Sequence, residues 1–92
     1  MAVDDAVVTI VVERRADVSG AAGVVIVAAD GRVVGYQPRP DPAEALSDLV
    51  DTGDHRVTAE AYEYLPEGTG WSSEAIPVLL EQDVPVYAFE QT

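Results

Sequence analysis

The sequence predicts an α/β domain built on a single mixed five-stranded sheet with two short helices. Three features predict this class: β-branched apolar runs, an Asp-Gly hairpin signal, and two short helix-like segments after the hairpin. The expected element order is β-β-β-α-β-α-β, a meander followed by parallel additions. At 92 residues the chain is expected to form one domain, residues 1–92.

The first three strands are expected in the N-terminal part of the chain. Residues 6–12, AVVTIVV, are β-branched and precede the polar stretch ERRADVSG, which indicates a strand and then a loop. Residues 23–29 and 32–37 are expected to pair as a hairpin. Asp30-Gly31 between them can supply the two positive-φ positions of a type I′ turn.

The first helix is expected directly after the prolines that end the hairpin. In Asp41-Pro42-Ala43-Glu44, Asp suits the N-cap, Pro the first helical position and Glu the third. Gly53 is placed to end this helix, which is then about ten residues long. Its apolar stripe consists of Ala45, Leu46, Leu49 and Val50.

A strand, a helix and a final strand complete the predicted order. Residues 56–65, RVTAEAYEYL, alternate small apolar side chains with polar or aromatic ones, which is typical of a strand. Ser72 or Ser73 can cap a second, short helix with Pro77 near its start. The inner residues of this helix are Ala75, Ile76, Leu79 and Leu80. Residues 84–89, VPVYAF, are the last strand, and Pro85 favours an edge position.

The chain is strongly acidic. Seventeen acidic residues face five basic ones, all arginine, and the net charge is −12. The acids are spread from Asp4 to Glu90, so they form a surface coating and not a tail. Molar salt shortens the Debye length to about 3 Å and removes the repulsion within such a coating. The chain also has no Lys, which a GC-rich genome alone could explain, but the charge predicts a halophilic protein.

Composition also disfavours several classes of partner and cofactor. Arg14-Arg15 is the largest basic cluster, which disfavours direct nucleic-acid binding and an anionic membrane surface. Without Cys there is no disulfide or thiolate metal site, and no metal ligand or cofactor is predicted. The acidic start, MAVDDAVV, differs from a secretory signal, and no apolar run reaches the ~18 residues of a membrane span. We expect a cytoplasmic protein.

Both faces of the predicted hairpin are apolar. In the type I′ register Val27 lies opposite Val34 and Val25 opposite Tyr36, and the other face is equally apolar. Five strands span roughly 20 to 24 Å, so two short helices cover about one side. We expect the other side to bind a protein, most simply a second copy of this chain. The alternative, one helix on each face, stays open.

Aromatic side chains with a polar tip extend this predicted interaction surface, because protein interfaces favour them. Their alternative role is to close the rim of a small core. The predicted surface consists of Val25, Val27, Val34, Tyr36, Tyr62, Tyr64 and Trp71.

No catalytic residue is predicted. His55, the chain's one histidine, follows Asp54 and the predicted helix end, so we expect a solvated loop residue, with proton transfer as the alternative. The serines have no neighbouring base that would activate a nucleophile, and Ser72 and Ser73 suit helix caps.

The segment GAAGVVIVAADGRVVGY and the element order resemble the opening of ribonuclease H-like domains, over residues 7–65. The resemblance implies a metal-dependent nuclease in which Glu44 matches the carboxylate of the first helix. The family's first-strand Asp has no counterpart here, and residues 56–65 offer Glu60 and Glu63 in place of its second Asp.

The function predicted from the sequence is a small, acidic, non-enzymatic protein-interaction module that acts as a homodimer or bound to a partner protein. One alternative is a viral or mobile-element inhibitor that mimics nucleic acid and binds a basic nuclease or repair protein. The other is a degenerate ribonuclease H-like nuclease.

Overall fold

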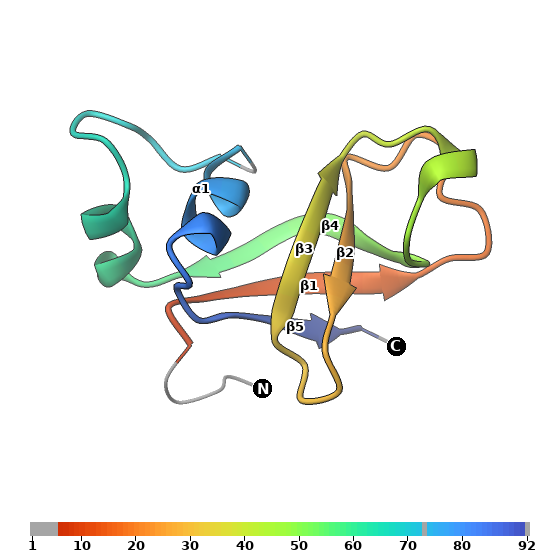
Figure 1. Ribbon diagram of the computed structural model, residues 1–92, viewed down its shortest axis with the longest axis horizontal. Helices are drawn as coiled ribbons and strands as arrows, with labels where there is room; N and C mark the ends of the chain where they lie inside the picture. The colour runs from red at the N-terminus through yellow and green to blue at the C-terminus, as the bar shows by residue number, and fades with distance from the viewer. Residues whose placement is uncertain (1–5, 73, 92) are drawn as a thin grey trace.

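The computed structural model describes residues 6–72 and 74–91 and contains one mixed five-stranded sheet (Figure 1). The strand order is β3-β2-β4-β1-β5. The predicted α/β class with a single mixed sheet is therefore confirmed. The strands are β1 (Val8–Arg14), β2 (Gly23–Val27), β3 (Val33–Pro38), β4 (Leu49–Val57) and β5 (Val86–Glu90). The helices are two 3₁₀ segments, η1 (Pro42–Glu44) and η2 (Ala59–Tyr64), and α1 (Ala75–Glu81).

Strand β1 lies between β4 and β5 and forms the centre of the core. It pairs antiparallel with β4 and parallel with β5. The expected meander of the first three strands is wrong, because β2 pairs with β3 and β4 and not with β1. The β-branched run suits this central position, because Val8, Ile10 and Val12 are buried on one face of β1 and Thr9 and Val11 on the other.

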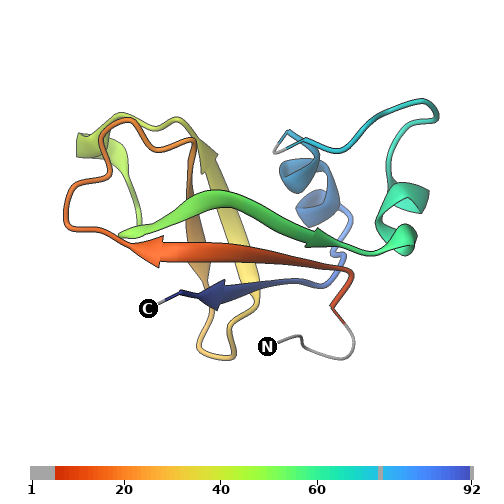
Figure 2. The same cartoon turned by 180° about the vertical axis from the view of Figure 1, so that it is seen from behind.

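The β2–β3 hairpin crosses the other three strands steeply. It joins β4 at a single pair, Val24 with Val50, and its tip reaches β5 through a bridge between Arg32 and Tyr87. Figures 1 and 2 show that the hairpin and α1 lie on one side of β1, β4 and β5. The larger core cluster fills the space between these two layers.

The hairpin turn differs from the predicted type I′ turn. Gly31 N–H donates to the Ala28 carbonyl at 2.9 Å, and Ala28 N–H donates to the Arg32 carbonyl at 2.8 Å. Among residues 28–32, Gly31 alone has a positive φ, of 88°. The loop therefore has three residues and ends in a left-handed glycine, a common alternative to the two-residue turn.

This turn changes the pairing at the end of the hairpin. The predicted pair of Val25 with Tyr36 is confirmed, but the register shifts after Ile26 and sets Val27 opposite Val33 in place of Val34. Val34 is 58 % exposed as a result.

The predicted helix after Asp41 is wrong beyond its first turn. The Asp41 carboxylate does cap this segment and accepts from the Ala43 amide at 3.0 Å. However, Leu49 and Val50 lie in β4, where they pair with the far end of β1, and Gly53 lies inside the same strand. Pairing with a buried strand has overridden the local helical pattern.

The predicted strand over residues 56–65 is also wrong. Only Arg56 and Val57 belong to β4, and the following residues form η2. Ala61 is fully buried there, whereas Tyr62 is 46 % exposed. The alternation of small and aromatic side chains therefore does not mark a strand. In η2 it places one small residue, Ala61, in the core.

The C-terminal elements agree with the prediction. In α1, Ala75, Ile76 and Leu79 are buried, Leu80 is half-buried in place of the expected full burial, and β5 is an edge strand. The predicted side-chain cap by Ser72 is not formed; instead the Ser72 backbone carbonyl accepts a hydrogen bond from the Ala75 amide at 3.0 Å. The alternative cap, Ser73, lies outside the described residues. Among the described residues no helix could span a membrane, since α1 has seven residues.

Candidate functional site

A buried polar network connects β3, β4 and the segment before α1. Its centre is the Asp51 carboxylate, whose side chain is 1 % exposed. The carboxylate accepts from the Tyr36 hydroxyl, from His55 Nε2 and from the Gly53 amide, each at 2.8 Å. A carboxylate this deeply buried is stable only because several donors compensate for the lost water.

The hydrogen bonds around His55 fix its tautomer. The indole Nε1–H of Trp71 donates to His55 Nδ1 at 3.0 Å. An indole nitrogen can only donate, so Nδ1 carries no proton. The proton of the neutral ring is then on Nε2, which donates to Asp51. The rings of His55 and Trp71 meet edge to face at 87°.

The carboxyl group of Asp51 is held in its ionised form. Burial raises its pKa, but the hydrogen bonds from His55, the Gly53 amide and Tyr36 together lower the pKa below its usual value. Asp51 is therefore a fixed negative charge inside the domain at neutral pH.

An irregularity in β4 brings Asp51 and His55 together. Residues four apart in a regular strand are about 13 Å apart, too far for contact. Here Ile10 of β1 pairs with His55 and Val12 pairs with Asp51, so β4 contains two extra residues at this point. Gly53 allows the chain to fold back because its φ is 89°, in the left-handed region that favours glycine.

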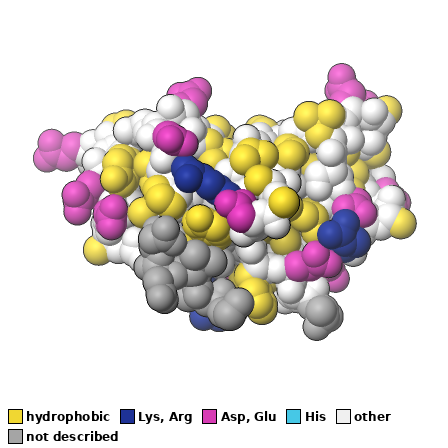
Figure 3. All heavy atoms as spheres, turned by 60° about the horizontal axis from the view of Figure 1, so that its bottom comes forward, with side chains coloured by type: hydrophobic (Ala, Val, Ile, Leu, Met, Phe, Trp, Pro, Cys, Tyr) yellow, Lys and Arg dark blue, Asp and Glu magenta, His cyan; other side chains and the backbone are white. Residues whose placement is uncertain are grey.

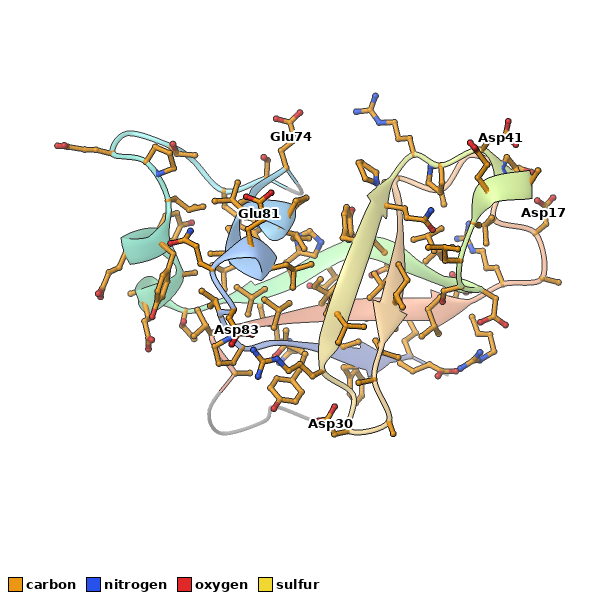
Figure 4. The ribbon with its side chains drawn as sticks, viewed as in Figure 1. Asp17, Asp30, Asp41, Glu74, Glu81 and Asp83 are labelled. Carbon is orange, nitrogen blue, oxygen red and sulfur yellow. The ribbon has the colours of Figure 1, made fainter. Side chains whose placement is uncertain are left out.

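A cavity of about 680 Å³ opens between the hairpin and the start of α1. One wall comes from the residues flanking the hairpin, and the other from the start of α1 and the segment before it. Arg39 is the one basic side chain of the lining, and Figure 4 shows Glu74 projecting from the start of α1. Trp71, a member of the network, directly precedes the lining residue Ser72. The lining residues are Ala22, Pro38, Arg39, Ser72, Glu74 and Pro77.

The structure brings together only two residues of the predicted interaction surface. Tyr36 and Trp71 meet through Asp51 and His55. Val25 is fully buried and lies on no surface, and Val34 and Tyr62 are exposed on different elements. Val27 and Tyr64 are half-buried against the core.

Sequence reasoning missed the role of His55. It was expected in solvent, yet its side chain is 8 % exposed. The signal was a glycine midway between an acid and a histidine, Asp51-Thr52-Gly53-Asp54-His55, which is visible only once this stretch is placed in a strand.

Acidic side chains are dispersed over the face that Figure 3 shows and do not form one ridge. Some of the charge is compensated locally: Arg14 bonds to Asp48 at 2.6 Å and to Glu90 at 3.1 Å. This dispersion agrees with a solvating coat.

Comparison with known proteins finds similarity to nucleotidyltransferases. No family profile matches it. It is 31 % identical over 68 residues to a UTP–glucose-1-phosphate uridylyltransferase of Synechocystis, and the match covers 72 % of this chain and 18 % of that protein. The chain thus spans about a fifth of the length of this curated relative.

Two solved structures share the fold. An inositol-1-phosphate CTP transferase from T. maritima matches with a TM-score of 0.71 and 22 % identity, over 97 % of this chain and 37 % of that one. An apo UDP-glucose pyrophosphorylase matches with a TM-score of 0.66 and 18 % identity, over 90 % of this chain and 34 % of that one. Both are nucleotidyltransferases, and neither is a ribonuclease H.

These similarities correct the function predicted from the sequence. The expected non-enzymatic interaction module is wrong, because the relative and both structural neighbours are enzymes of nucleotidyl transfer. They support neither the nucleic-acid mimic nor the nuclease. Composition misled the prediction because charge and exposed apolar area report on solvent and contacts, and not on chemistry. Binding of a second copy stays a prediction.

Proposed function

We propose that this chain takes part in nucleotidyl transfer to a sugar or polyol phosphate, and that it binds the phosphate-bearing acceptor in the cavity beside Arg39. The observation that carries the proposal is the 31 % identity over 68 residues to a uridylyltransferase whose name specifies glucose 1-phosphate. One structural neighbour is named for inositol 1-phosphate. Both compounds combine one phosphate with a ring that bears several hydroxyl groups.

The cavity suits such an acceptor in size and chemistry. Its volume of about 680 Å³ falls within the usual range for small-molecule sites. The Arg39 guanidinium can donate two parallel hydrogen bonds to a phosphate. Ser72 and Glu74 on the opposite wall can accept hydrogen bonds from ring hydroxyls.

Charge favours the acceptor over the nucleoside triphosphate at this cavity. A triphosphate would bring several negative charges to one arginine, beside Glu74 and in a chain of net charge −12. A sugar monophosphate needs only one cationic partner. With a single guanidinium the expected affinity is weak, with a Kd of about 1 mM, equivalent to about −4 kcal/mol.

The proposed contribution of this chain to the reaction is positioning. In nucleotidyl transfer an oxygen of the acceptor phosphate attacks the α-phosphorus of the nucleoside triphosphate, and pyrophosphate leaves. Holding the acceptor in place lowers the entropic part of that barrier. As part of the same proposal we place the protein in the cytoplasm, where both substrates occur.

Nitrogen-15 NMR titration of the full chain tests the proposal. Glucose 1-phosphate and inositol 1-phosphate are expected to shift the amides of Ala22, Arg39, Ser72 and Glu74. Arg39→Ala should abolish these shifts. Arg15→Ala is the matched control, because Arg15 is also an exposed arginine but pairs with Glu13 and does not line the cavity.

Two results would contradict the proposal. One is that neither sugar phosphate shifts these four amides, or that the shifts persist in Arg39→Ala. The other is that UTP or CTP binds this cavity more tightly than both sugar phosphates, which would assign the cavity to the nucleotide.

A further inference from the structure

The geometry points to a second role for the buried network. We propose that His55 is a protonation-controlled latch that holds residues 66–72, here called the Trp71 segment, against the sheet. The latch consists of the hydrogen bond from Trp71 Nε1–H to His55 Nδ1, at 3.0 Å.

The latch requires neutral histidine. Trp71 can only donate, so it bonds to His55 only while Nδ1 has a free lone pair. Protonation places a second N–H on the ring, directed at the indole N–H. Two donors then face each other in a site where His55 is 8 % exposed, and the bond to Trp71 is lost.

The contact between His55 and Asp51 responds in the opposite way. Nε2 donates to the Asp51 carboxylate in the neutral and in the charged ring. When the ring gains its charge, this bond becomes a charge-assisted ion pair and strengthens. Acid therefore opens the indole contact while His55 stays attached to the sheet, which separates the latch from general acid unfolding.

Few charged groups face the ring. The Asp51 carboxylate of β4 contacts the ring directly. The Tyr36 hydroxyl of β3 donates to the same carboxylate. Asp54 and Arg56, the neighbours of His55 in β4, line a separate groove with Thr9 and Phe89. The partners in the paired strands and the buried face of α1 are apolar: Ile10, Ala88, Ala75, Ile76 and Leu79.

Few contacts hold the Trp71 segment to the rest of the described chain. Residues 66–70 and Ser72 are exposed, and Trp71 alone in the segment is half-buried against the core. Its backbone hydrogen bonds are local: the Thr69 amide donates to the Pro66 carbonyl, and the Ser72 carbonyl accepts from the Ala75 amide at the start of α1. In Figure 1 the segment arches outward between η2 and α1. A segment with so few contacts opens at low free-energy cost.

Opening of the segment changes the cavity. Ser72 follows Trp71 directly and lines the cavity. When the indole leaves the sheet, Ser72 is held only from the side of α1, through its bond to the Ala75 amide, and its part of the wall is less preorganised. If the cavity binds a sugar phosphate, which rests on the function proposed above, binding weakens as His55 gains its proton.

Trp71 fluorescence tests the latch in the full chain without any ligand. Trp71 is the chain's one tryptophan and His55 its one histidine, so both signals are unambiguous. Between about pH 8 and pH 5, where histidines change charge, acrylamide quenching of Trp71 should rise in a single step. The indole ¹⁵N–¹H resonance should shift in the same step. The ratio of closed to open segment should fall about tenfold, the ratio that one ordinary net hydrogen bond provides.

His55→Gln is the decisive variant, because glutamine offers a donor and an acceptor but takes up no proton. It should remove the step. A step of equal size in His55→Gln, or no step in the wild-type chain, would overturn the latch.

Trp71→Phe provides a second test if His55→Gln does not fold. It removes the indole N–H and keeps an aromatic ring. The melting temperature of Trp71→Phe should lie below that of the wild-type chain at about pH 8, and the gap should close towards pH 5. A gap that is independent of pH would also refute the latch. Sugar-phosphate binding at about pH 8 tests the proposed function separately, since the latch is closed there.

Discussion

The Tyr36 hydroxyl donates a hydrogen bond to the Asp51 carboxylate at 2.8 Å and so connects β3 to β4 across β2, the strand between them. This path is open because Gly23 of β2 lies against the Tyr36 ring, where any Cβ would overlap the hydroxyl. One side-chain bond thus ties the steeply crossing hairpin to the rest of the sheet.

Tyr36→Phe is expected to lower the free energy of unfolding by about 1–3 kcal/mol, the cost of leaving a buried charged acceptor without one donor. Urea denaturation measures it. Tyr62→Phe is the matched control, because Tyr62 is 46 % exposed and its change should stay within about 0.5 kcal/mol. Equal losses in the two variants would show that the bond to Asp51 contributes nothing.

Gly53→Ala should destabilise the domain by about 1–2 kcal/mol, because a Cβ is strained in the left-handed region. The φ of Gly53 is 89°, and no atom lies within 4 Å of an added Cβ, so crowding plays no part. Gly70→Ala is the control: its surroundings are equally open and its φ is not in that region. The melting temperatures of both variants test this prediction. A Gly53→Ala protein as stable as Gly70→Ala would show that the left-handed conformation of Gly53 in β4 carries no strain for a Cβ.

The ionised Asp51 carboxylate should make the free energy of unfolding depend on pH in the acidic range. Its pKa is lower in the folded chain than the ordinary value of about 3.9, so its contribution is present above that pH and is lost as pH falls through the folded value. The wild-type chain should therefore exceed Asp51→Asn in unfolding free energy at neutral pH, where the carboxylate is ionised. Denaturation at a series of pH values below about 5 should show the two curves converging. Curves that stay parallel would mean that Asp51 is not the linked group.

Salt should raise the melting temperature strongly. The net charge is −12, and acidic side chains are dispersed over the face that Figure 3 shows. The screening length falls from about 10 Å at 0.1 M to about 3 Å at 1 M salt. Glu67→Gln, which removes one exposed charge, should stabilise the chain at low salt and have no effect in molar salt. A melting temperature that is flat or falls with potassium chloride would contradict the prediction of a halophilic protein.

Local patterns determined several parts of this protein. The β-branched run of β1, the apolar stripe of α1 and the Asp41 cap each depend on residues a few positions apart, and the structure agrees with all three. The sheet class follows as well, because such strands and helices pack in few ways.

Only the tertiary structure decided what residues 45–64 became. Leu49 and Val50 suit a helix by spacing, but they pair with Arg14 and Glu13, more than 30 residues earlier, and burial in the sheet outweighs the weak local preference. The candidate site was hidden for the same reason. Asp51, His55, Tyr36 and Trp71 come together through the register of β4, the crossing of the hairpin and the fold-back at Gly53. These are contacts between distant parts of the chain. The free energy that they contribute therefore cannot be inferred from a short stretch of neighbouring residues.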